Sequence, residues 1–284
     1  MFLKATVSQG KFMLRQKKAW IVFYILLAMV LVNFVTNVLM FRGMDSLAMY
    51  QPMKLLLLSW NKTMSGGDLL LGFLQIYPLL VICPAAFSLA EEQQSKEYIL
   101  LSARLGNMKY RFSKLLAVFG VTFLIFTLPF FIEIILNCLA FPLNAQGDLS
   151  NWNYYDPTYI ESVNNYLFSK IFLMSPYLSA VLGTILFGIA SGIFAAFTTA
   201  FSSVVRFRYR IFLFLPIFIL LNLTEIVSSI LFRRGMGFRL SWYHYCLLYN
   251  DEPKNVAYFL ILMSILILLT IGGMYIGGKK DCMS

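Results

Sequence analysis

Long apolar stretches dominate the chain and are separated by shorter polar segments. Six stretches of about 20 or more predominantly apolar residues occur, at 20–40, 69–89, 115–139, 177–205, 211–232 and 256–276. A helix of about 20 residues crosses the ~30 Å hydrocarbon core of a bilayer. Because no water pairs with backbone groups there, helix is the element expected. The pattern predicts an all-α polytopic membrane protein with six transmembrane helices, folded as a single transmembrane domain over residues 1–284.

The first 19 residues alternate basic and apolar positions. Helical spacing places Leu3, Val7 and Leu14 on one side. The basic residues lie on the other side: Lys4, Lys11, Arg15, Lys17 and Lys18. This pattern predicts an amphipathic interfacial helix over residues 1–19, with Trp20 at the level of the lipid headgroups. The alternative interpretation is a basic flank that only orients the first span.

Composition and charge agree with a membrane protein and suggest its orientation. Residues are 60% hydrophobic and 13% charged, whereas soluble domains have about 45–50% and 25%. With the N-terminus inside, 15 of the 23 Lys and Arg residues fall in the short inner segments, 1–19, 90–114, 206–210 and 277–284. This positive-inside bias predicts a plasma-membrane protein with both termini cytoplasmic and an outer loop at 141–176. Anionic membrane lipid is a sufficient partner for the net charge of +10, so no nucleic acid is expected.

Two further outer segments have an unusual composition. In the loop 41–68, the stretch Met44–Trp60 is apolar enough to lie on the outer membrane surface. The segment 233–255 is rich in aromatic residues: Trp242, Tyr243, Tyr245 and Tyr249. It is expected either to dip into the membrane as a short re-entrant helix or to lie in the interfacial aromatic belt.

Two carboxylates lie inside predicted spans, Glu133 in the third and Glu225 in the fifth. A charged carboxylate facing lipid is unfavourable, so each is expected to face protein or water or to be protonated. Both are candidates for contact with a cargo or for proton binding. The alternative is a structural hydrogen bond to a neighbouring helix or, for Glu225, to Asn222 or Ser228 of its own helix.

The fourth span carries small residues at every fourth position: Thr184, Gly188, Gly192, Ala196 and Ala200. Such a stripe allows close approach of a second helix. Gly188, Gly192 and Ala196 are therefore candidates for packing within the chain, for a subunit interface or for the wall of a translocation path. Separately, prolines are expected to kink two spans, at Pro78, Pro84 and Pro129.

Motifs for catalysis or cofactor binding are missing. His244 is the only histidine, and the four cysteines are scattered, so neither a metal site nor a disulfide framework is expected. No GxxxxGK[ST] phosphate loop occurs. The chain is therefore not expected to be an enzyme or to bind a cofactor, and any ATPase that drives it is a separate protein.

Polar chemistry is concentrated in the segment 90–114, between the second and third spans. The 24 positions from Glu91 to Lys114 hold three of the 13 acidic and five of the 23 basic residues. Charges flank an apolar centre at Tyr98–Leu101, a pattern typical of an amphipathic helix that docks into a groove of a partner. The alternative interpretation is a solvated charged loop.

In the order of these elements, the chain resembles the membrane subunit (permease) of ABC-2-type ABC exporters. The residues that carry the resemblance are Glu91, Glu92, Glu97, Leu100-Leu101-Ser102, Arg111 and Ser113-Lys114-Leu115-Leu116, together with the closing Gly277-Gly278-Lys279-Lys280-Asp281. Two features of the family are missing: its Gly-Thr pair, which would fall near Ser95-Lys96, and its proline, which would fall at Ala103–Leu105.

The resemblance implies a coupling helix in the segment 90–114 that docks on an ATPase. The implied contact residues are Glu91, Glu92, Glu97, Tyr98, Leu100, Leu101 and Arg104. The implied partners are two cytoplasmic ABC ATPase subunits, which bind ATP and Mg²⁺, and a second permease copy, in a bacterial cell membrane. Closure of the ATPases would move the helices as rigid bodies between inward and outward states.

Two other classes of function compete with transport. A non-transporting receptor or immunity protein would bind a peptide or lipid through its outer loops and needs no motif. A lipid-modifying enzyme needs a His-Asp or DxD cluster, and none occurs. Phe-rich spans with few charges favour a hydrophobic or amphipathic cargo, namely a peptide, an antibiotic or a lipid-like compound.

Overall fold

This computed structural model describes a helical protein. The described part of the chain comprises residues 2–43, 51–59, 64–94, 102–103, 106–143, 165–205, 210–235, 237, 239–249 and 253–281, and no strand occurs in it. The long helices are α2 (Lys17–Met40), α3 (Met64–Ile82) with α4 (Phe87–Gln94), α6 (Asn107–Ala140), α9 (Pro176–Val204), α10 (Leu215–Arg233) and α12 (Val256–Asp281). They supply six spans long and apolar enough to cross a membrane, which confirms the predicted all-α multi-pass architecture.

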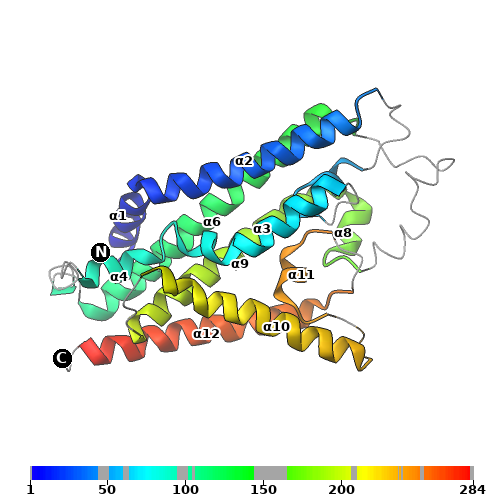
Figure 1. The fold of residues 1–284 in the computed structure, drawn as a ribbon. Helices are drawn as coiled ribbons and strands as arrows, with labels where there is room; N and C mark the ends of the chain where they lie inside the picture. Colours follow the sequence, from blue (N-terminus) through cyan, green and yellow to red (C-terminus); the bar gives the residue numbers. More distant parts are fainter. Residues whose placement is uncertain are drawn as a thin grey trace.

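Both chain termini lie at the same end of the bundle, here called the termini end (Figure 1). The opposite end, here called the far end, holds α8 (Ser169–Met174). At the termini end, α1 (Phe2–Arg15) packs on α6 and turns away from the axis of α2 (Figure 1). Three shorter helices complete the described chain: η2 (Pro52–Leu55), η3 (Arg210–Phe214) and α11 (Trp242–Cys246).

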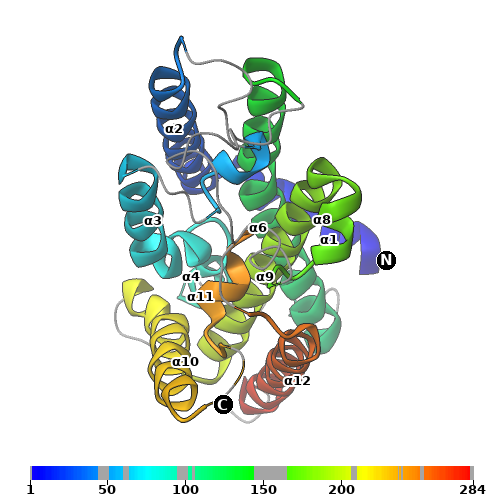
Figure 2. The same cartoon turned by 90° about the vertical axis from the view of Figure 1, so that its right-hand side faces the viewer.

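The bundle has a central group of helices and a peripheral group. α9 packs against α6, α12, α3 and α10, and lies near the middle of the end-on view (Figure 2). Over half of the apolar window of α9 is buried, at 56%, against 22% for α10. The outer helices instead expose apolar side chains such as Leu39, Ile226 and Leu268, as expected of faces that contact lipid.

The third span is longer than predicted. α6 has 34 residues and is about 51 Å long, more than the ~30 Å needed to cross the hydrocarbon core. The prediction that residues 107–114 belong to a loop was therefore wrong. The chain turns at Gly106, whose φ of +82° favours glycine, and α6 begins at the next residue. The helix continues here because the side chains of Arg111 and Lys114 are buried against other elements.

The prolines in the spans act differently from one another. At Pro84 the chain breaks, since α3 ends at Ile82 and α4 begins at Phe87. Pro78 and Pro129 lie inside continuous helices. In a helix interior, proline removes a backbone hydrogen bond. Only at Pro84 does the expected distortion become an interruption of the helix.

The small-residue stripe of α9 packs against α6. A Cβ added at Gly188 would lie 2.0 Å from Oγ1 of Thr127, and one added at Gly192 would lie 2.7 Å from the ring of Phe119. Ala196, one turn further on, is buried as well. Two helices can approach this closely only where one of them has glycine at the contact positions. Gly188 and Gly192 therefore pack within the chain, on α6, and are covered by it.

We expect Gly192→Ala to lower the unfolding temperature. The added methyl group requires the Phe119 ring to shift, and such overpacking costs about 1–3 kcal/mol. Gly120→Ala, in α6, is the matched control: nothing lies within 4 Å of its Cβ position, and alanine is favoured over helical glycine by about 0.5–1 kcal/mol. Thermal unfolding of both variants in detergent, followed by tryptophan fluorescence, measures the difference. Equal unfolding temperatures would contradict the close contact.

Candidate functional site

The residues predicted to carry function lie at opposite ends of the bundle. Glu91 and Glu92 lie in α4 at the termini end, whereas Glu133 lies in the far half of α6. Glu225 lies in the peripheral helix α10. The other predicted coupling residues lie outside the described part of the chain: Glu97, Tyr98, Leu100, Leu101 and Arg104.

At the termini end, a buried ion pair joins α4 to α6. The Glu92 carboxylate accepts hydrogen bonds from Lys114 Nζ, at 2.5 Å, and from the Tyr110 hydroxyl. Lys114 is fully buried and Glu92 is only 7% exposed. We call Glu92, Tyr110 and Lys114 the loop-base cluster, because Glu92 precedes the connection between α4 and α6 and the other two residues follow it. A buried charge is tolerated when it is paired and hydrogen-bonded in this way.

Other side chains tie α6 to the remaining elements at this end. Asn107 accepts a 2.9 Å hydrogen bond from Arg111 Nε and donates to the carbonyl of Gly278 in α12. The hydroxyl of Ser113 donates to the Tyr110 carbonyl at 2.8 Å and lies 3.4 Å from Oε1 of Gln9 in α1. These contacts connect the start of α6 with both chain termini. The ion pair of Glu91 with Lys18 of α2 is weaker, because Lys18 is 47% exposed.

At the far end, residues 51–59 insert into the bundle, and we call them the inserted segment. The prediction that this stretch lies on the outer surface was wrong, because Met53 and Leu55 to Leu58 are all at most 1% exposed. The segment forms the short helix η2 and is then irregular. Irregular backbone at membrane depth needs partners for its polar groups, and the protein must supply them.

Asparagine side chains donate hydrogen bonds to the carbonyl groups of the inserted segment. Nδ2 of Asn33 and Nδ2 of Asn37 each lie 2.9 Å from the carbonyl oxygen of Leu55. Nδ2 of Asn137 lies 3.3 Å from the carbonyl oxygen of Pro52. All three asparagines are buried. They replace the water that such carbonyl groups would otherwise bind.

Glu133 accepts a hydrogen bond from the same segment. Its Oε1 lies 2.7 Å from the backbone nitrogen of Leu57 and 2.8 Å from Nδ2 of Asn33. Glu133 is fully buried, and Oε2 has no hydrogen-bond partner within the described residues. The geometry thus fits the structural interpretation of Glu133, as an acceptor that joins α2, α6 and the inserted segment. We call Asn33, Asn37, Glu133 and Asn137 the amide cluster.

A second segment, residues 239–249, also enters the bundle. Its short helix α11 lies among α3, α9, α10 and α12 in both views (Figures 1 and 2). Trp242 is buried, with its ring centroid 5.2 Å from that of Phe194 in α9 and 5.9 Å from that of Phe259 in α12. The segment is therefore packed among the helices of the bundle.

The two inserted stretches meet each other. The backbone nitrogen of Leu248 donates to the carbonyl of Leu58 at 2.8 Å. The Leu248 side chain fits against Gly183 of α9, where a Cβ would lie 2.2 Å from Cδ2 of Leu248. Nearby, burial raises the pKa of the Cys246 thiol to about 12, because an apolar surrounding disfavours the thiolate. Cys246 is therefore neutral at physiological pH.

Glu225 does not form the hydrogen bonds predicted for it. The Asn222 amide donates instead to the carbonyl of Phe218, and the Ser228 hydroxyl accepts from the backbone nitrogen of Leu240. Asn222 follows the common pattern of bonding one turn back in its own helix. Ser228 binds the backbone of Leu240, at the start of the second inserted stretch, residues 239–249. The structural interpretation of Glu225 based on these two neighbours was wrong.

Sequence reasoning missed the asparagines of the amide cluster, although a signal was present. Asn33 and Asn37 are four residues apart in the first span, and Glu133 and Asn137 are four residues apart in the third. Side chains at this spacing share a helix face. Two such polar pairs in apolar helices indicate faces that meet something polar, here the backbone of the inserted segment.

Within the described residues, no three His, Cys, Asp or Glu side chains are grouped so as to hold a metal ion. Comparison of the chain with protein-family models, with curated proteins and with solved structures gives no match. The two candidate sites are therefore interpreted from their own geometry.

We expect Glu133→Leu to reduce the yield of folded protein, whereas Glu133→Gln retains it. Leucine leaves the Leu57 N–H and one of the two N–H groups of the Asn33 amide without an acceptor, at about 1–3 kcal/mol for each unsatisfied group. Glutamine keeps a carbonyl oxygen at that place. Glu225→Leu is the matched control, a carboxylate that lacks its predicted bonds. Size-exclusion profiles and unfolding temperatures in detergent measure the effect, and equal behaviour of both leucine variants would refute the structural role of Glu133.

Proposed function

We propose that this chain is the permease subunit of an ATP-binding-cassette exporter. It moves a hydrophobic or amphipathic cargo outward across a bacterial cell membrane, using ATP that separate cytoplasmic subunits bind with Mg²⁺ and hydrolyse. A second permease copy completes the transporter. Six candidate spans without a nucleotide-binding motif support this division of labour.

The loop-base cluster is the observation that carries the proposal. A coupling helix can pass a push from an ATPase to the spans only if both of its ends are fixed to them. The ion pair between Glu92 and Lys114 holds the two sides of the 95–105 connection together, and both residues are buried. A connection that only links two spans needs no such pair, because a buried ion pair contributes little net stability compared with apolar packing.

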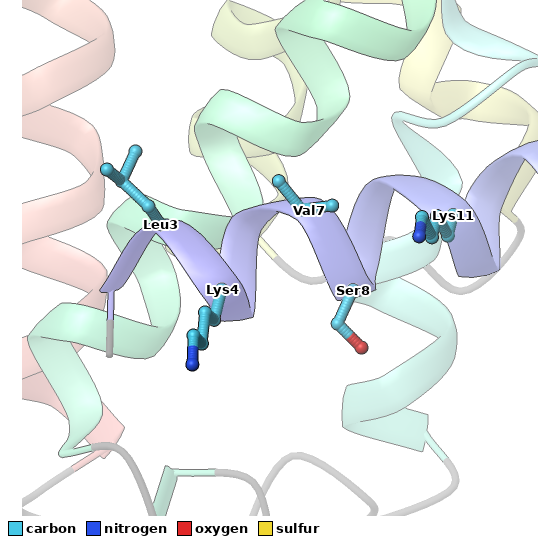
Figure 3. A pocket seen from close by; sticks show the side chains of 5 residues that line it. All are labelled: Leu3, Lys4, Val7, Ser8 and Lys11. Carbon is cyan, nitrogen blue, oxygen red and sulfur yellow. The ribbon is translucent and has the colours of Figure 1, made fainter.

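The proposed orientation puts the termini end in the cytoplasm, with α1 in the inner membrane interface. Leu3 and Val7, 74% and 55% exposed, project from one side of α1, while Lys4 and Ser8 project from the opposite side (Figure 3). A helix with this division of side chains inserts its apolar face into the interface and keeps its cations near anionic headgroups. A shallow hollow along the helix is lined by these four residues and Lys11 (Figure 3).

Cysteine labelling tests the orientation. In a cysteine-free background, a membrane-impermeant thiol reagent added outside intact cells should modify a cysteine introduced by Asn153→Cys but not one introduced by Gln94→Cys. The reason is the excess of Lys and Arg in the segments assigned to the cytoplasm. Permeabilised cells are the control, in which both positions should react. The reverse pattern in intact cells would place the 90–114 segment outside and exclude its coupling role.

Substitutions in the connection test the coupling role. Tyr98→Asp or Leu101→Asp would bury a carboxylate at a docking groove, so we expect at least a tenfold loss of ATPase binding, or about 1.4 kcal/mol. Glu97→Ala is the milder control, since a rim charge contributes little and is screened by salt. The measurement is the amount of ATP-binding subunit that co-purifies with the tagged chain, together with its ATP turnover. If both Asp variants behave as wild type, the receptor or immunity protein becomes the better proposal.

A further inference from the structure

The inserted segment is held at the far end in the way that a bound peptide would be held. Hydrogen bonds of the amide cluster reach its backbone: amide groups donate to the carbonyls of Pro52 and Leu55, and Glu133 accepts from the N–H of Leu57. Backbone groups of this kind are present in every peptide, whatever its sequence. Its apolar side chains, including Met53 and Leu58, are buried in the surrounding helices.

The residues that hold the segment belong to the continuous helices α2 and α6, and the place they line is here called the groove. Asn33 and Asn37 lie in α2, and Glu133 and Asn137 lie in α6. Besides the short helix η2, the segment's own bonds run from Lys54 N–H to the Gln51 carbonyl, from Ser59 N–H to the Leu56 carbonyl and from the Ser59 hydroxyl to the Met53 carbonyl. The bonds to the amide cluster are additional to these and fix the segment to α2 and α6.

The segment leaves some buried polar atoms of the groove without a hydrogen-bond partner within the described residues. Oε2 of Glu133, Oδ1 of Asn33 and Oδ1 of Asn137 are buried and have no hydrogen-bond partner within the described residues. The two amide oxygens are acceptors, and a buried acceptor without a donor is unfavourable. A different occupant with more N–H groups in reach, or with an N-terminal ammonium group, would satisfy them.

We propose that the groove between α2 and α6 binds an apolar peptide, and that residues 52–58 occupy it as a built-in substitute for that peptide. This inference rests on the proposed transport function and names the cargo class as a hydrophobic peptide. A lipid chain has no regular donors and acceptors for the amide cluster, and a sugar has no apolar side chains for the pockets around the segment. Only a peptide matches both features.

Binding to the purified chain in lipid nanodiscs tests the proposal without any ATPase. The probe is a fluorescent peptide with the sequence of residues 52–59, Pro-Met-Lys-Leu-Leu-Leu-Leu-Ser, measured by anisotropy against empty nanodiscs. Leu57→Pro removes the N–H that Glu133 accepts and should release the chain's own segment. We expect this variant to bind the probe at least tenfold more tightly than wild type.

A modified probe shows whether the amide cluster recognises the backbone of the peptide. Methylation of the peptide nitrogen that corresponds to Leu57 removes the donor to Glu133 and should weaken binding about tenfold, or about 1.4 kcal/mol. Asn37→Ala, added to Leu57→Pro, should weaken the unmethylated probe similarly. If Leu57→Pro does not fold, Leu58→Ala takes its place, since it truncates a buried anchor of the segment and leaves the amide cluster intact.

The outcomes separate this inference from the proposed function. Equal binding of the methylated and unmethylated probes, or no binding to a folded variant, would overturn the peptide groove while ATPase co-purification still supported the permease. Backbone-dependent binding by a chain that recruits no ATPase would support the groove and count against the permease.

Discussion

Non-helical backbone inside a membrane must find its hydrogen bonds within the protein, and this constraint shapes the far half of the molecule. The inserted segment brings carbonyl and N–H groups into the buried interior of the bundle, where partners from the protein replace water. Asn33, Asn37, Glu133 and Asn137 take the place of water, and in doing so they bind α2 to α6 through the segment. Without these side chains, the backbone of residues 51–59 would lack hydrogen-bond partners in the bundle, and the segment would no longer be held between α2 and α6.

The same helix, α6, connects this polar region with the loop base. Lys114 and Glu133 are 19 residues apart in one continuous helix, which corresponds to about 28 Å. Close packing of α9 on α6, with Gly192 against Phe119, stiffens the part between them. In the proposed transporter, a push at the loop base would therefore move α6 as a rigid body and change the spacing of α2 and α6 at the groove.

The spans could be predicted from sequence because span length and apolar composition are local properties. The position of residues 51–59 could not be predicted, because a stretch on a membrane surface and a stretch inside a bundle have the same apolar composition. What decides between the two is whether distant side chains, such as Asn37 and Asn137, meet its backbone. The start of α6 was missed for a similar reason. Arg111 and Lys114 look like loop residues until their partners, Asn107 and Glu92, are known. The sequence likewise does not reveal the partners of Asn222 and Ser228. Asn222 bonds the carbonyl of Phe218 in its own helix, and Ser228 accepts from the backbone nitrogen of Leu240, which lies 12 residues further along the chain.

The two ends of α6 differ in how strongly their contacts resist rearrangement. At the loop base, two opposite charges are buried together, and leaving one of them buried without its partner costs about 3–5 kcal/mol. At the groove, each amide-to-carbonyl bond contributes only about 0.5–1.5 kcal/mol net, and a peptide that takes the place of the segment restores it. The first contact is therefore suited to stay closed while the helices move, and the second is suited to exchange its occupant. In the proposed transporter, α6 joins these two contacts, because Lys114 and Glu133 lie in one continuous helix.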